Sequence, residues 1–238
     1  MDLKEEDILG EAVSDHWYYQ SKASALLGYV KHLNPQSVLD VGAGSGFFSK
    51  ELLKKTGATE ALCIDTSYQS ERNELVSGKS ILYRTHSGPV EVDLVLMMDV
   101  LEHVDDDVGL LGEYVDKVSA GTHFLITVPA FSFLWSGHDV FLGHKRRYTL
   151  KEIEKVAEKA GLIVERGSYY FGLVFPMAAV LRLLDSVLGS RGHPPSSQLK
   201  RHNPITNATL KGMCSVDRLF LRINRLAGLS AFCLARKP

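Results

Sequence analysis

The chain has 238 residues, of which 45% are apolar and 23% are charged. This composition is typical of one large globular domain, or of one domain with an addition, and it excludes disordered and fibrous classes. The net charge of -1 excludes a global electrostatic attraction to nucleic acid or to an anionic membrane. Eight Lys and Arg residues stand against two Asp residues between Arg182 and Arg225, so we predict a basic segment on an acidic body.

Strand and helix patterns alternate from residue 37 to residue 170, after a predicted N-terminal helix. The spacing of apolar residues predicts helices at 15–33, 47–55, 107–118 and 149–160. The last of these has Thr149 as its N-cap and Glu152 in the position of a capping box. Short apolar runs predict strands at 37–41, 61–64, 80–83, 92–98, 123–128 and 163–170. Such an alternation predicts an α/β fold with a mostly parallel sheet.

The alternation stops after residue 170. An apolar helix is expected at 171–188, a basic Gly/Pro/Ser-rich loop at 189–204, and an amphipathic helix from Leu210 to Ala227. A final apolar run at 229–235 predicts one more strand. We therefore divide the chain into an N-terminal helical lid (1–36), a core (37–170 and 228–238) and a helical insert or cap (171–227).

The cysteines and the N-terminal residues indicate the compartment. Cys63, Cys214 and Cys233 are far apart, which predicts buried thiols in a reducing environment and neither a disulfide framework nor a structural zinc site. Residues 1–7 are acidic and lack an apolar run, so we expect no signal peptide. No segment approaches the ~18 apolar residues of a membrane-spanning helix. A cytoplasmic protein is expected.

The run VLDVGAGSG at 38–46 joins the first predicted strand to a helix. Its glycines permit positive φ angles and a close approach of the backbone to a ligand, and the start of the helix offers free N–H groups. Asp65 ends the second predicted strand, where a carboxylate can accept hydrogen bonds from both hydroxyls of a ribose. These features predict a nucleoside ligand at the carboxyl ends of the strands.

The glycine spacing narrows the choice of nucleoside. It reads GxGxG, whereas dinucleotide sites read GxGxxG. Asp40, two residues before the first glycine, would repel a pyrophosphate and would suit an ammonium or a sulfonium group. An NAD-type oxidoreductase is therefore the less favoured alternative. A protein that binds a nucleoside without catalysis is a further alternative.

Two segments resemble class I S-adenosylmethionine-dependent methyltransferases. VLDVGAGSGFFS at 38–49 resembles their motif I, and MMDVLEHVDDD at 97–107 resembles the segment that ends their fourth strand. The resemblance covers residues 15–170 and the last strand. It implies a Rossmann-like sheet of seven strands, with helices on both faces and an antiparallel last strand, and it implies S-adenosylmethionine as the cofactor.

The resemblance also implies roles for individual residues. The glycine loop would pass under the methionine part of the cofactor, Asp40 would serve the amino group through the loop, and Asp65 would hold the ribose. The sulfonium would lie near the end of the fourth strand, and an aromatic cluster near residue 17 would cover the site. The predicted cofactor residues are Asp40, Gly42, Ala43, Gly44, Gly46, Asp65, His86, Met98, Asp99 and Tyr19.

Methyl transfer from a sulfonium requires a nucleophile aligned in line with the methyl group, and sometimes a base. The segment WSGHDVFLGHKRRY at 135–148 follows the fifth predicted strand and should lie on the cofactor side. Its GHxRRY part resembles a segment found in a bacterial subgroup of small-molecule methyltransferases. Some members of this subgroup resemble proteins associated with the metabolism of polyprenyl-linked sugars. The candidate catalytic residues are His144, His138 and Tyr148, and the candidate substrate residues are Trp135, Arg146 and Arg147.

Several roles stay open in the sequence. Arg146, Arg147 and Tyr148 could instead brace the connection between a strand and a helix. The pair Glu102–His103 could face the methyl donor or begin a solvated helix. Three acids at 105–107 are typical of a helix cap, so no metal is predicted.

We therefore expect O-, N- or C-methylation of a small-molecule or lipid-linked acceptor. The insert 171–227 could cap the active site, contact a membrane surface peripherally through its basic residues, or form a dimer interface. Nucleic acid is not an expected partner, because no NPPY-type motif occurs. The acceptor and the oligomeric state are left open by the sequence.

Overall fold

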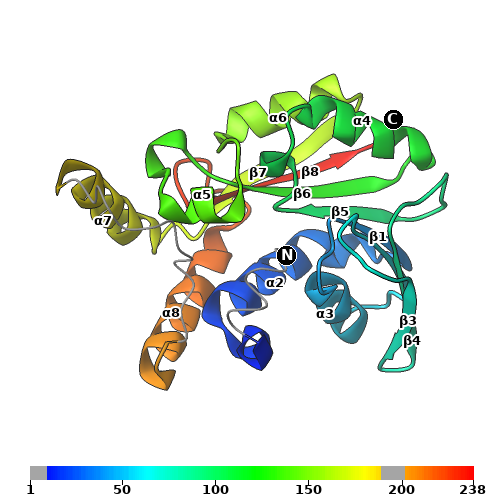
Figure 1. Ribbon diagram of the computed structural model, residues 1–238, viewed down its shortest axis with the longest axis horizontal. Helices are drawn as coiled ribbons and strands as arrows, with labels where there is room; N and C mark the ends of the chain where they lie inside the picture. Colours follow the sequence, from blue (N-terminus) through cyan, green and yellow to red (C-terminus); the bar gives the residue numbers. More distant parts are fainter. Residues whose placement is uncertain (1–9, 189–201) are drawn as a thin grey trace.

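A computed structural model describes residues 10–188 and 202–238, and in this part of the chain eight strands form one sheet (Figure 1). Their order is β3-β4-β2-β1-β5-β6-β8-β7. The strands are β1 (Ser37–Val41), β2 (Glu60–Ile64), β3 (Arg72–Val76), β4 (Lys79–Arg84), β5 (Leu94–Met98), β6 (His123–Pro129), β7 (Ile163–Tyr170) and β8 (Ser230–Arg236).

Helices cover both faces of the sheet, as the sequence predicts. Helices α2 and α3 lie on one face, and α4 and α6 lie on the other (Figure 1). The α-helices are α2 (Trp17–Val30), α3 (Phe47–Lys55), α4 (Asp107–Lys117), α5 (Gly137–Leu142), α6 (Leu150–Lys159), α7 (Phe175–Leu188) and α8 (Pro204–Asp217). The 3₁₀-helices are η1 (Gly10–Asp15), η2 (Lys31–Leu33), η3 (Leu101–His103), η4 (Ser132–Leu134) and η5 (Arg218–Phe220).

Two hydrophobic cores follow from the alternation of side chains along each strand. Val38 packs in the core under α2 and α3, whereas its neighbour Leu39 packs in the core under α4 and α6. All five residues of β5 are buried, because a central parallel strand is covered on both faces.

The sheet is mostly parallel, and β8 runs antiparallel to both of its neighbours, β6 and β7. This arrangement confirms the predicted antiparallel last strand. The predicted number of seven strands is wrong, because β3 pairs antiparallel with β4 at the edge of the sheet. The hairpin turns at Ser77 and Gly78, which both have positive φ, as tight hairpins require.

The capping box of α6 is confirmed. Thr149 Oγ1 accepts a hydrogen bond from the Glu152 amide, and the Glu152 carboxylate accepts one from the Thr149 amide. The three cysteines are buried free thiols, as predicted.

The insert differs from its prediction. Helix α8 packs against α2 and ends at Asp217, whereas the sequence predicts that this helix continues to Ala227. Phe220 and Ile223 are 50% and 73% exposed, so the apolar face that they would form is not covered by the described chain. Helix α7 extends from one end of the body (Figure 1). Most of the loop expected at 189–204 lies outside the described residues.

None of the helices in the described ranges is both long enough and apolar enough to cross a membrane.

Candidate functional site

The loop between β1 and α3 turns on three glycines with positive φ angles, which are +66° at Gly42, +54° at Gly44 and +71° at Gly46. Side-chain-bearing residues rarely adopt this conformation. A Cβ atom at Gly42 would lie 2.7 Å from Cγ2 of Val100, and one at Gly46 would lie 2.8 Å from the hydroxyl of Tyr83. The path of this loop therefore requires glycine at both ends.

The glycine loop is fastened to the carboxyl end of β2. The amides of Gly42 and Ala43 donate hydrogen bonds to the carbonyl of Ile64, at 2.7 and 3.1 Å. The Gly44 amide donates to Oδ2 of Asp65 at 3.0 Å, and the Tyr68 hydroxyl donates to the Gly44 carbonyl at 2.5 Å. The structure thus brings Asp65 to the loop together with Tyr68, which was not predicted from the sequence.

Asp40 lies buried beneath the loop and accepts a hydrogen bond from Ser49 of α3, with 2.7 Å between the two oxygens. Burial raises the pKa of the Asp40 carboxyl to about 6, and the charge of Asp65 acts in the same direction. The carboxyl group therefore connects β1 to α3 and adds negative charge beneath the loop when it ionises.

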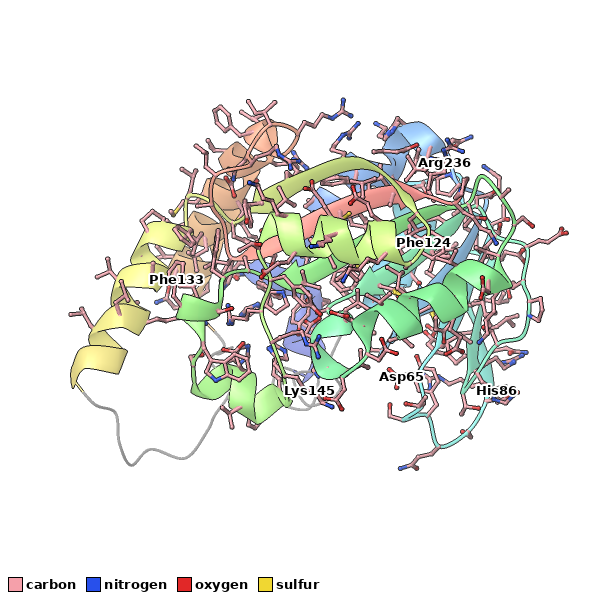
Figure 2. All side chains as sticks on the ribbon, turned by 90° about the horizontal axis from the view of Figure 1, so that it is seen from above. Asp65, His86, Phe124, Phe133, Lys145 and Arg236 are labelled. Carbon is pink, nitrogen blue, oxygen red and sulfur yellow. The ribbon has the colours of Figure 1, made fainter. Side chains whose placement is uncertain are left out.

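His86 lies just beyond the end of β4, the strand next to β2. The Asp65 amide donates to the carbonyl of Arg84 at 3.1 Å, so the residues after these two strands meet at one end of the sheet (Figure 2). The His86 ring is exposed, and its Nδ1 lies 3.0 Å from the hydroxyl of Thr85.

Asp99 follows β5 in a left-handed conformation, with φ +57°. Its carboxylate forms an ion pair with the buried ammonium of Lys22 from α2, and it accepts a hydrogen bond from Thr127 of β6 at 3.1 Å. Burial opposes ionisation of both groups, but their mutual attraction outweighs it: the pKa of Asp99 is lowered and the pKa of Lys22 is raised. Met98, the residue before Asp99, is buried.

Helix α2 also brings Tyr19 to the beginning of α3. The Tyr19 ring is buried, and its centroid lies 5.6 Å from that of Phe47, the first residue after the glycine loop. The N-terminal helix therefore contacts the start of α3 through Tyr19 and the end of β5 through Lys22.

The segment after β6 is organised around Asp139, a fully buried residue of α5. Arg147 donates to both carboxylate oxygens of Asp139, at 2.7 and 3.0 Å, and Nδ1 of His144 lies 2.9 Å from Oδ1. Although burial favours the neutral acid, these bonds hold the pKa of Asp139 well below its usual range. The sequence analysis does not identify Asp139. The sequence feature that could have identified Asp139 is its position three residues after Ser136. This spacing is typical of a capping box, which the two residues form at the start of α5.

Arg146 and Tyr148 face the start of α4. The Arg146 guanidinium and the Tyr148 hydroxyl both donate to Oδ2 of Asp107, at 3.2 and 2.8 Å. Of the remaining candidates, Trp135 is 41% exposed, and burial lowers the pKa of His138 to about 4.

Glu102 is fully buried in η3, and within the described chain neither of its carboxylate oxygens has a hydrogen-bond partner. Burial raises the pKa of Glu102 well above its usual value, and the nearby charge of Asp99 adds to the effect. The rings of His103 and His144 are close by and meet edge to face, with centroids 4.8 Å apart.

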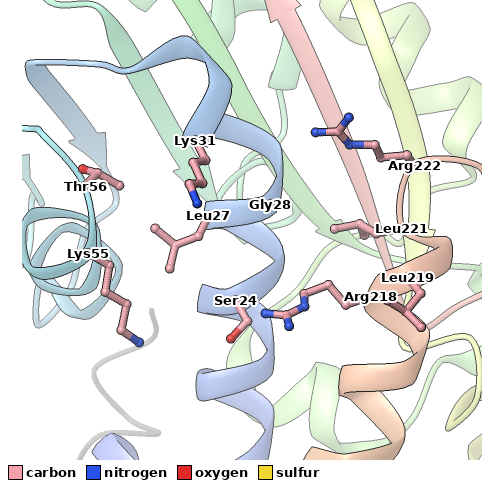
Figure 3. Close-up of a pocket in the computed structure, with 10 residues that line it drawn as sticks. All are labelled: Ser24, Leu27, Gly28, Lys31, Lys55, Thr56, Arg218, Leu219, Leu221 and Arg222. Carbon is pink, nitrogen blue, oxygen red and sulfur yellow. The ribbon is translucent and has the colours of Figure 1, made fainter.

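A separate hollow of about 450 Å³ lies between the carboxyl-terminal ends of α2 and α3 and the helix η5 (Figure 3). Because the glycine loop is at the other end of α3, this hollow is distinct from the residues described above. Four of the side chains that line it are cationic: Lys31, Lys55, Arg218 and Arg222.

Comparison with known proteins identifies likenesses in sequence and in fold. A family model described as a methyltransferase domain matches residues 15–166. Among solved structures, an S-adenosylmethionine-dependent methyltransferase from Archaeoglobus fulgidus is 17% identical, with a TM-score of 0.55, and the match covers 99% of this chain and 98% of that one. An O-methyltransferase family protein from Burkholderia thailandensis is 11% identical, with a TM-score of 0.53, and the match covers 92% of this chain and 56% of that one.

A further match is a chain of the Haloferax volcanii complex between the Trm112 methyltransferase activator and a methyltransferase. It is 16% identical, with a TM-score of 0.53, and the match covers 100% of this chain and 98% of that one. No curated protein matches the sequence. At these identities the structural likeness shows the fold alone.

Proposed function

This chain belongs to the methyltransferase domain family, and we propose that it uses S-adenosylmethionine, binds this cofactor at the glycine loop, and methylates a small-molecule or lipid-linked acceptor. The observation that carries this proposal is the meeting of the glycine loop with Asp65 and Asp99 at the carboxyl ends of β1, β2 and β5. Ligands of open α/β sheets bind at these ends.

The residues present fit a sulfonium nucleoside. A Cβ atom at Gly42 would clash with Val100, and one at Gly46 would clash with Tyr83. Both positions are therefore glycine, and the loop carries no side chain there. Asp40 and Asp65 provide negative charge around the loop, which suits a cationic ligand and disfavours a pyrophosphate. This charge argues against the alternative of an NAD-type oxidoreductase.

We assign the ribose hydroxyls to Asp65 and the methionine part to the loop 42–46, with Asp40 acting on the amino group through the loop. His86 is assigned to the adenine, since it follows the strand next to β2. Tyr19, Met98 and Asp99 are assigned to the sulfonium side. The cofactor supplies the electrophilic methyl group. The protein aligns the acceptor and excludes water.

We propose that His144 acts on the acceptor. Its Nδ1 is engaged by Asp139, which orients the imidazole and leaves Nε2 for the chemistry, as in other carboxylate–histidine pairs. Arg147 holds Asp139 in place. The bonds that Arg146 and Tyr148 make to Asp107 favour the bracing role that the sequence leaves open for them.

A second observation favours a lipid-linked acceptor or a peripheral contact with an anionic membrane surface. Helix α7 is attached to the segment after β6 through Arg182, which donates to the hydroxyl of Ser136 at 2.8 Å. Large apolar side chains on α7 and around η5 are about half exposed or more: Met177, Val180, Leu181, Leu184, Leu219, Phe220 and Ile223. Apolar side chains mixed with arginines are typical of surfaces that bind lipid.

Calorimetric titration with S-adenosylmethionine, S-adenosylhomocysteine and NAD tests the cofactor assignment. We expect heat from the two sulfur nucleosides and none from NAD, and the opposite result would overturn the proposal. A labelled methyl donor, offered with lipid-linked sugars and phenols as acceptors, tests the acceptor class. Cofactor that binds but is never demethylated with any acceptor would favour the alternative of a non-catalytic nucleoside-binding protein.

A further inference from the structure

The buried carboxylate of Glu102 lacks a hydrogen-bond partner within the described residues. Removing a carboxylate from water without compensation is costly, and buried acids are therefore paired, protonated or bound to a metal. The ammonium of Lys22 already pairs with Asp99. The two remaining ways to compensate the burial of Glu102 are a bound proton and a bound cation, and the neighbouring side chains favour the cation.

Two histidines complete a set of three metal-binding side chains around this carboxylate. One donor atom from each of Glu102, His103 and His144 lies within 4.8 Å of the others. Donors on one tetrahedral zinc ion are roughly 3.4 Å apart, given bonds of ~2.0–2.2 Å. Side-chain rotations that shorten the separations by up to ~1.4 Å, the difference between 4.8 and 3.4 Å, would bring all three donor atoms onto one ion.

A backbone hydrogen bond joins the two segments that carry these residues, η3 and the segment around His144. The Lys145 amide donates to the carbonyl of Glu102 at 2.7 Å, which fixes His144 opposite η3. Asp139 engages Nδ1 of His144 at 2.9 Å, so Nε2 is the nitrogen that can bind an ion. A carboxylate behind a ligating histidine is the usual outer shell of zinc sites, where it sets the tautomer and the ring orientation.

We propose that Glu102, His103 and His144 bind a divalent transition-metal ion of the zinc type. Two imidazoles and one carboxylate suit Zn²⁺, Co²⁺ and Fe²⁺, whereas Mg²⁺ and Ca²⁺ prefer oxygen ligands. Three protein ligands leave a coordination position open, as in catalytic rather than structural zinc sites.

The chemical use of the ion rests on the proposed function and changes the role of His144 in it: with Nε2 bound to the ion, His144 would act on the acceptor through the ion and not as a free base. The open position would take a hydroxyl oxygen of the acceptor, and a bound cation makes such a hydroxyl more acidic. The O–H proton passes to solvent, and the oxygen forms a bond to the methyl carbon as the carbon–sulfur bond breaks. The electron pair of that bond remains on sulfur, so the products are a methyl ether and S-adenosylhomocysteine.

Metal binding is measured directly on the tag-free chain, by calorimetry with Zn²⁺ and by the visible absorption of Co²⁺. We expect one ion per chain. Glu102→Gln, which preserves side-chain shape, and His144→Ala should each weaken binding at least ~10-fold, and Asp139→Asn should weaken it roughly 10–100-fold through the outer shell. The exposed-histidine variant His32→Ala is the control and should bind as the parent does.

Absence of one-to-one binding in the parent protein, or equal binding by Glu102→Gln, would overturn the metal site. Titration of the same samples with S-adenosylhomocysteine reports the cofactor site separately, so the two proposals fail independently. If chelator-treated enzyme methylates a hydroxyl acceptor as fast as enzyme reloaded with Zn²⁺, the catalytic use of the ion is wrong even where the ion binds.

Discussion

The buried ammonium of Lys22 in α2 forms an ion pair with the partly exposed carboxylate of Asp99 at the carboxyl end of β5. The residues are 77 positions apart in the chain, and the pair attaches the N-terminal helix to the end of the strand that is assigned to the sulfonium side. The helix is thus a fixed wall of the site, anchored by charge as well as by apolar packing.

Lys22→Met should destabilise the protein by ~1–3 kcal/mol, because it leaves the partly buried carboxylate of Asp99 without its counter-charge. The free energy of unfolding in urea measures this loss. The double variant Lys22→Met/Asp99→Asn, which removes both charges, should recover a large part of the stability. A double variant no more stable than Lys22→Met would contradict a dominant role for the pair.

Asp65→Asn should weaken binding of S-adenosylhomocysteine roughly 10–100-fold, since it removes charge-assisted hydrogen bonds worth ~1.5–3 kcal/mol each. Calorimetry gives the dissociation constant. The matched control is Asp116→Asn on the exposed surface of α4, which should leave the affinity unchanged. An unaltered affinity in a folded Asp65→Asn variant would exclude the ribose role.

Gly46→Ala and Gly78→Ala separate backbone strain from steric collision. Both glycines have positive φ, but a Cβ at Gly78 meets no atom within 4 Å, whereas one at Gly46 meets the Tyr83 hydroxyl at 2.8 Å. We expect a loss of ~1–2 kcal/mol for Gly78→Ala from conformation alone, and a further ~1–3 kcal/mol for Gly46→Ala from overpacking. Urea unfolding measures the loss in the free energy of unfolding for each variant. Equal losses would show that the Tyr83 side chain moves aside without destabilising the protein.

The stability of the protein without cofactor should depend on pH through Asp40. Burial raises the pKa of this carboxyl from 3.8 to about 6, so the folded state holds a proton more tightly than the unfolded state. The tighter proton binding by Asp40 adds roughly 3 kcal/mol to the free energy of unfolding below pH 3.8. This stabilisation is lost as the pH rises from 3.8 through about 6. Asp40→Asn, which cannot ionise, should therefore gain stability relative to the parent at pH 8.

Urea unfolding of the parent and of Asp40→Asn at pH 5 and pH 8 tests this dependence, because the difference between the two proteins cancels the other titrating groups. The relative stability of the variant should increase between the two pH values. A difference that is the same at both pH values would mean that Asp40 does not titrate in this range.

The surface around η5 should bind anionic vesicles in a salt-sensitive manner. Arg218 and Arg222 line a cationic hollow beside exposed apolar side chains, and each basic residue near an anionic surface contributes ~1 kcal/mol. Arg218→Ala/Arg222→Ala should thus weaken sedimentation with phosphatidylserine vesicles roughly 30-fold. Lys151→Ala/Lys155→Ala on the exposed face of α6 is the control. Failure of the parent protein to bind at low salt would refute the membrane contact.

Much of the sheet was predictable because its central strands are buried on both faces and read as short apolar runs. Leu94–Met98 is such a run. Strand β3 gave no such signal, since four of its five residues are polar or exposed and Leu75 is 74% exposed. Its hairpin turn, Ser77–Gly78, was the one local cue. The prediction that the last helix continues beyond Asp217 was wrong. A periodic pattern of apolar residues does not reveal whether another element covers the apolar face that a helix would form.

The glycine loop and the place of Asp65 at the end of β2 were predictable because the motif and the strand ends lie in one continuous stretch of chain. Lys22 was expected beside the aromatic cluster that would cover the site, but its pairing with Asp99 was not predicted. Asp139 and Tyr68 were not identified, since their roles depend on contacts that form only in the folded chain. A single sequence records the charge of Lys22 but not that its ammonium is buried against Asp99.

The position of β8 between β6 and β7 imposes an order of assembly. Strand β7 reaches its end at Tyr170, yet its neighbour begins only at Ser230, after α7 and α8. During synthesis from the N-terminus, the first seven strands emerge with a gap beside β6. The carboxyl-terminal strand then enters between two existing edges, and until it does so, those edges resemble the unpaired strands through which nascent chains aggregate.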